Sequence, residues 1–136
     1  VFDVEVDTAS GQIHLTNTAI AGDAGQIINP DGLANQLEGG VLQAASWTLK
    51  EQVHYGPDGV ASRDWDTYPV LRFAEIPPVS VKLLDQPGAP SLGSGEATQG
   101  PTPAAIANAV FDAVGVRLRE MPFTPERVKA ALTQPQ

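Results

Sequence analysis

The amino-acid sequence predicts an α+β fold, with strands and helices mixed in a single domain. Apolar and polar residues alternate over 1–7 and again over 79–84, as they do in half-buried strands. Apolar residues recur at helical spacing over 33–53 and 103–114. At 136 residues, the chain is long enough for one domain with a modest core. No repeat and no long linker divides it, so residues 1–136 are expected to form one unit.

The first half of the chain predicts a hairpin followed by the longest helix. Ser10 and Gly11 form a turn signal, so the strand over 1–7 is expected to pair with a second strand over 12–20. Asn29 or Asp31 can cap the following helix, with Pro30 at or just before its first turn. The helix is expected to bury a face formed by Leu33, Leu37, Val41, Leu42, Ala45, Leu49 and Val53.

The second half is organised by turn and cap signals. The tetrad at 56–59, Gly-Pro-Asp-Gly, predicts a tight turn. The following segment, 60–68, contains Trp65 and has two interpretations: its aromatic residues line a pocket, or they pack on one another. Thr124 is a good cap for a last helix that reaches about residue 132.

Composition excludes several classes of partner and site. The net charge is -8, with eight Lys and Arg against sixteen Asp and Glu, whereas nucleic acids and anionic membranes need a basic surface. The chain has no cysteine, so it supplies neither disulfides nor thiolate ligands for iron–sulfur clusters. Its two histidines, His14 and His54, lie far apart and do not predict a metal site. No apolar run approaches the roughly twenty residues of a membrane span.

The chain begins directly on a predicted strand, without Met or an export signal. We therefore expect a fragment, a cleavage product or a separately encoded chain of a larger assembly.

A glycine-rich loop carries the first candidate for catalysis. In Gly93-Ser94-Gly95-Glu96, a single carboxylate follows two glycines and precedes the helix predicted at 103–114. Glycine lets a backbone or a ligand approach closely, so the pattern suggests an acid or base aimed into a cleft. The alternative is an ordinary glycine-rich connection with one solvated glutamate.

A second candidate lies near the start of the long helix. Gly39 and Gly40 are adjacent, and glycine in a helix interior costs about 0.5–1 kcal/mol relative to alanine. Either another helix packs closely on this turn, or a bulky ligand lies against it. Gln36, one turn earlier, can bind such a ligand or simply remain a surface residue.

Three blocks in order give the chain a family resemblance. The first is Ile28-Asn29-Pro30-Asp31-Gly32 with Gln36-Leu37-Glu38-Gly39-Gly40, and the second is Gly93-Ser94-Gly95-Glu96. The third is 104–119 with Met121-Pro122-Phe123-Thr124-Pro125. Together they resemble the C-terminal part of the molybdopterin-binding subunit of the xanthine dehydrogenase and aldehyde oxidoreductase family. Ala97 departs from the pattern, because many members have proline after the glutamate.

The resemblance implies a cofactor, a reaction and roles for seven residues. It implies that the α+β unit is part of a larger subunit that binds a molybdopterin (cytosine) dinucleotide with molybdenum. The reaction would be hydroxylation of an aldehyde or an N-heteroaromatic ring with oxygen from water, and Glu96 would be the base. The expected cofactor contacts are Gln36, Gly39, Gly40, Gly93, Ser94 and Gly95, and no side chain is expected to ligate the metal.

The resemblance also implies partners and a compartment. The remainder of the molybdopterin-binding subunit would complete the pocket. An iron–sulfur subunit, with or without a further FAD or haem-containing cytochrome subunit, would carry electrons away. The expected compartment is the cytoplasm, with the periplasm as the alternative. The competing hypothesis is a non-catalytic structural or interaction domain that retains the family fold.

Overall fold

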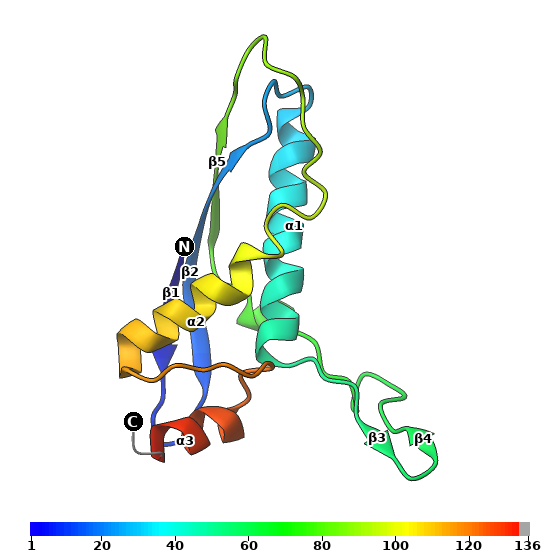
Figure 1. Cartoon of the computed structure of the whole chain (residues 1–136), viewed down its shortest axis with the longest axis vertical. Coiled ribbons are helices and arrows are strands. Elements are labelled where there is room, and N and C mark those ends of the chain that lie inside the picture. The colour runs from blue at the N-terminus through cyan, green and yellow to red at the C-terminus, as the bar shows by residue number, and fades with distance from the viewer. Residues whose placement is uncertain (134–136) are drawn as a thin grey trace.

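The computed structural model describes residues 1–133, which form a three-stranded sheet with helices packed against it (Figure 1). Strand β2 (Ile13–Asp23) is central, with β1 (Phe2–Val6) antiparallel on one side and β5 (Val79–Leu84) parallel on the other. The predicted hairpin and the strand over 79–84 are therefore confirmed. Strand β2 continues three residues beyond the predicted end at Ile20, where Gly22 faces Leu37 of the long helix.

The long helix, α1 (Pro30–Leu49), begins as predicted and ends early. The side chain of Asn29 accepts a hydrogen bond from the backbone N–H of Gly32, and Pro30 occupies the first turn. The predicted end at Val53 is wrong. Lys50 leaves the helical conformation, and the N–H of Phe123 donates to the carbonyl of Thr48 over 2.6 Å. This tertiary contact satisfies a carbonyl of the last turn.

Two further helices close the core. Helix α2 (Pro101–Val114) packs on β1 and α1 and ends at Gly115, which has a left-handed backbone. Helix α3 (Pro125–Thr133) starts at the predicted cap, where the N–H of Val128 donates to the carbonyl of Thr124. The buried apolar core is formed by Phe2, Ile13, Leu15, Val41, Ala45, Leu49, Ile106, Val110, Phe123 and Val128.

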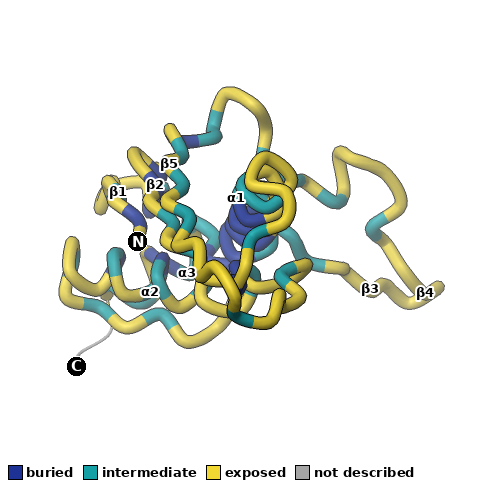
Figure 2. The backbone as a smooth tube through the Cα atoms, turned by 90° about the horizontal axis from the view of Figure 1, so that it is seen from above, coloured by how far each residue is buried: buried dark blue, intermediate teal, exposed yellow. Residues whose placement is uncertain are grey.

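The segment 50–78 forms an arm. Residues 53–68 project from the body (Figures 1 and 2), whereas 69–78 return against it, where Leu71 packs on the core and Pro77 is buried. The arm contains the short hairpin of β3 (Tyr55–Gly56) and β4 (Gly59–Val60) around the predicted turn, and the 3-10 helix η1 (Phe73–Glu75). Trp65 is 74% exposed, which contradicts the expectation that the aromatics of 60–68 pack on one another. Within residues 1–133, no helix combines the length and apolar character needed to cross a membrane.

Candidate functional site

The glycine-rich loop and α1 meet, although they lie far apart in the sequence. The side-chain Nε2 of Gln36 donates a hydrogen bond to the carbonyl of Gly95 over 2.7 Å, across 59 residues of chain. This contact brings together the first two sequence blocks, next to Glu96. The side chain of Gln36 therefore binds the loop, and its amide oxygen is the part that can still accept a bond from a ligand.

Gly40 lies beneath the loop, at its contact with Thr98. The hydroxyl of Thr98, a residue only 8% exposed, donates to the carbonyl of Leu37 over 2.9 Å. A Cβ added to Gly40 would lie 2.4 Å from that hydroxyl oxygen. Close packing thus explains Gly40, but the segment that packs on it is the glycine-rich loop that carries Glu96, and not another helix as expected.

Gly39, Gly93 and Gly95 present open backbone instead. A Cβ added to any of them would meet no other atom within 4 Å. None of the three has a positive φ, so conformational freedom is not what these positions require. Their shared property is bare backbone, which a planar or bulky group can approach closely.

Glu96 is exposed and is not among the residues that line the adjoining cavity. That cavity, of about 360 Å³, lies between β2, α1 and the start of α2, and its walls include Ser94, Ala97 and Thr98. The expectation of a carboxylate aimed into a cleft therefore stays a prediction. The two ion pairs of residues 1–133 involve Glu75 and Glu120, so no cation neutralises Glu96 there.

Sequence reasoning missed Thr98 and the contact between Gln43 and Gln99. The Nε2 of Gln99 donates to the side-chain oxygen of Gln43 over 2.9 Å, across 56 residues. No local pattern marks either contact. The glycine pair in α1 was the only sequence signal that something packs there.

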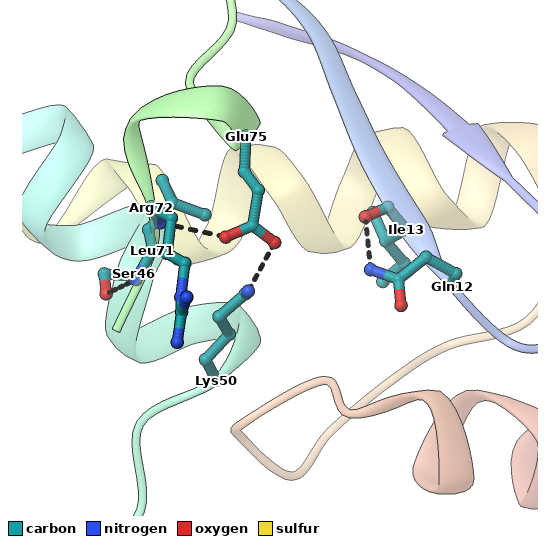
Figure 3. Close-up of polar contacts among 7 residues, drawn as sticks. All are labelled: Gln12, Ile13, Ser46, Lys50, Leu71, Arg72 and Glu75. Atoms are coloured by element: carbon teal, nitrogen blue, oxygen red, sulfur yellow. Dashed lines mark hydrogen bonds and ion pairs between the residues drawn. The ribbon is translucent and has the colours of Figure 1, made fainter. Parts of the chain in front are cut away.

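A second cavity, of about 760 Å³, lies at the C-terminal end of α1, and none of the predicted site residues lines it. Figure 3 shows Glu75 between the ammonium of Lys50 and the backbone N–H of Arg72, which donates to it over 2.9 Å. Partial burial favours the protonated form of Glu75, but the bonds from Lys50 and Arg72 outweigh it and lower the pKa of the carboxyl. Beside it, Leu71 donates its N–H to the Ser46 hydroxyl.

Within residues 1–133, no three His, Cys, Asp or Glu side chains are grouped so that they could hold a metal ion.

Sequence comparison and fold comparison with known proteins point to one and the same family. The family model described as "Molybdopterin cofactor-binding domain" matches residues 1–77. The chain is 48% identical over 132 residues to one of the subunits of nicotinate dehydrogenase from Pseudomonas putida, an alignment that covers 97% of this chain and 11% of the relative.

Solved structures agree with this assignment. Quinoline 2-oxidoreductase from Pseudomonas putida 86 superposes with a TM-score of 0.85 at 29% identity, covering 96% of this chain and 18% of that one. Aldehyde oxidoreductase from Desulfovibrio gigas superposes with a TM-score of 0.79 at 27% identity, covering 96% of this chain and 15% of that one. The chain thus spans only between 11% and 18% of the length of these three relatives.

Proposed function

The chain belongs to the molybdopterin cofactor-binding domain family, and from this premise we propose that it forms the C-terminal part of the cofactor-binding subunit of a molybdenum hydroxylase. The observation that carries the proposal is the hydrogen bond from Gln36 to Gly95, which joins two blocks of the family pattern beside Glu96. The remainder of the subunit would supply the other walls of the pocket.

The residues at the contact between α1 and the glycine-rich loop fit a molybdopterin dinucleotide. Gly39, Gly93 and Gly95 leave bare backbone where a Cβ would otherwise stand, and Gln36 retains an amide oxygen as acceptor. The described residues offer no cluster of metal-ligating side chains, which suits a metal held by its own organic ligands. Gly40 is buried beneath Thr98, so it would act indirectly, by letting the loop pack on α1. Ser94 would contact the cofactor between Gly93 and Gly95.

When bound, the cofactor supplies the oxygen-transfer and two-electron chemistry of the reaction. Glu96 would act as general base, its carboxylate accepting a proton from the water-derived hydroxyl that attacks the substrate carbon. The exposure of Glu96 and the absence of a cationic partner within residues 1–133 leave the carboxylate free for this role.

We propose an N-heteroaromatic ring or an aldehyde as substrate, in keeping with the names of the relatives. The cofactor would be the cytosine dinucleotide. Iron–sulfur clusters would accept the electrons, with FAD or haem in further partner subunits. The clusters would lie in a partner subunit, because this chain has no cysteine to ligate one. The assembly would be cytoplasmic.

The direct test is Glu96→Gln in the assembled enzyme. The variant should keep its molybdenum and pterin content and lose turnover by about 10²–10⁴-fold, the usual contribution of a general base. Asp112→Asn, which removes an exposed carboxylate of α2, is the matched control and should turn over normally. Near-normal turnover of the Glu96 variant would remove Glu96 from the mechanism.

The second candidate function is a non-catalytic structural or interaction domain, favoured by the position of Glu96 outside the adjoining cavity. Native mass spectrometry of material from the natural source separates the two. A complex with a larger partner and a molybdopterin dinucleotide supports the enzyme. A species near the mass of the chain alone supports the non-catalytic domain.

A further inference from the structure

We propose that Thr98 is a positioning residue for Glu96, held in place because Gly40 has no side chain. The role of the held loop in catalysis rests on the function proposed above, whereas the contact itself does not.

The loop is fixed to a single stripe of α1. Its partners on the helix are Gln36, Gly40 and Gln43, at the i, i+4 and i+7 spacing that places residues on one helical face. Their counterparts on the loop are Gly95, Thr98 and Gln99, which lie on both sides of Glu96. The segment that carries the carboxylate is therefore held at both ends.

Of these contacts, that of Thr98 is the buried one. The side chains of Gln36 and Gln99 make exposed hydrogen bonds, for which water competes. Thr98 is buried and is bound twice: its hydroxyl donates to Leu37, and its carbonyl accepts a bond from the Thr102 hydroxyl over 2.7 Å. Because buried polar groups are costly to leave unpaired, this contact resists displacement more than the exposed ones.

Thr98 also connects the loop to α2. Thr102 belongs to the first turn of α2, so the position of Thr98 is set by two helices at once. Residues 96–99 form a turn just before α2, in which the N–H of Gln99 donates to the carbonyl of Glu96 over 3.1 Å. Glu96 thus takes its place from α1 and α2 without its own side chain being held.

The two adjacent glycines of α1 allow a matched test of this contact. A Cβ at Gly40 would lie 2.4 Å from the Thr98 hydroxyl oxygen but 3.8 Å from the Thr98 Cβ, whereas a Cβ at Gly39 would meet nothing within 4 Å. Gly40→Ala should therefore displace the loop, and Thr98→Ala should remove the obstacle. The quantity to measure, by NMR in the full chain, is the rate at which the backbone N–H hydrogen of Gln99 exchanges with solvent.

Gly40→Ala should accelerate this exchange about tenfold, Thr98→Ala should accelerate it about threefold, and Gly39→Ala should leave it unchanged. The double variant Gly40→Ala with Thr98→Ala should exchange no faster than Thr98→Ala alone. If the two single effects multiply in the double variant, or if Gly40→Ala behaves like Gly39→Ala, the contact does not hold the loop and the proposal is overturned.

The assembled enzyme provides the readout that a purely structural role would not change. Thr98→Val, which keeps the volume and removes the hydroxyl, should lower kcat about tenfold at a nearly unchanged KM, and Thr98→Ser should restore kcat. Equal kcat values for the wild type and Thr98→Val would overturn the positioning role. If Glu96→Gln turns over normally while the exchange results hold, the contact is upheld and the proposed function fails.

Discussion

Gly25 fixes the segment that precedes the glycine-rich loop. Its φ is +69°, and a Cβ there would lie 2.0 Å from the carbonyl oxygen of Pro90. Its own carbonyl accepts a bond from the N–H of Gln86, and the neighbouring carbonyl of Ala24 accepts one from Leu92. Gly25 is thus constrained by both its backbone conformation and its close backbone contact.

A matched pair of substitutions separates these two constraints. Gly88 has a similar φ of +85° but open space where a Cβ would stand. Gly88→Ala should cost about 1 kcal/mol of unfolding free energy, from the left-handed backbone alone. Gly25→Ala should cost about 3 kcal/mol, because the Pro90 backbone must also move. Urea unfolding of both variants measures the difference, and equal losses would contradict the packing argument.

At the scale of elements, an ion pair links the end of α1 to the arm. Lys50 follows the last residue of α1, and Glu75 is the last residue of η1. The capping interaction of Glu75 with the Arg72 N–H fixes the carboxylate that Lys50 meets (Figure 3). Both side chains are partly exposed, at 26% and 36%, so solvent screens the pair and limits its contribution to below about 1 kcal/mol.

This pair predicts a modest pH dependence of stability. Burial alone would raise the pKa of Glu75 in the folded chain, but the bonds from Lys50 and Arg72 outweigh burial and lower the pKa. A group with a depressed folded pKa stabilises the protein above its unfolded pKa and loses that contribution as pH falls through the folded value. Stability should therefore decline from about pH 4.5 downward, and Glu75→Gln should make the decline shallower.

Thermal unfolding of the wild type and Glu75→Gln between pH 7 and pH 3 measures this effect. Glu5→Gln, at an exposed position of β1, is the control and should leave the slope as it is. An identical slope for Glu75→Gln and the wild type would exclude the pair as a source of the pH dependence.

At the scale of the whole molecule, the chain has a packed body and an exposed arm, which Figure 2 shows extending to one side. The body is built around the sheet, α1 and α2, whereas large apolar side chains of the arm are uncovered: Tyr55, Val60, Trp65 and Phe73. The projecting part of the arm, 53–68, therefore has few buried contacts to resist local opening.

Limited proteolysis should report this division. Chymotrypsin cleaves after aromatic residues, and Tyr55, Trp65 and Phe73 are more than 70% exposed, whereas Phe2 and Phe123 are buried. The first cuts in the full chain should fall in the arm and leave an N-terminal fragment ending at or after Tyr55. Mass spectrometry of the early products locates the cuts. Initial cleavage after Phe2 or Phe123 would contradict the description of the arm as the least protected segment.

Sequence patterns predicted which residues form the candidate site, because family blocks and glycine pairs are visible along the chain. Gln36 and the loop with Gly95 and Glu96 could be proposed in this way, and the structure brings them together. The partner of Gly40 could not be predicted. Thr98 lies 61 residues from the carbonyl that its hydroxyl binds, and nothing in its local sequence indicates burial.

The local elements could be predicted from the sequence alone: the first hairpin, the strand over 79–84, and the starts of α1 and α3. Alternation, helical spacing and caps are properties of neighbouring residues, so they can be recognised in sequence alone. Tertiary contacts set the rest: β5 pairs parallel with β2, α1 stops at Leu49, and Thr98 lies on Gly40. Each of these depends on residues brought together from distant parts of the chain, where packing and backbone hydrogen bonding override local preference.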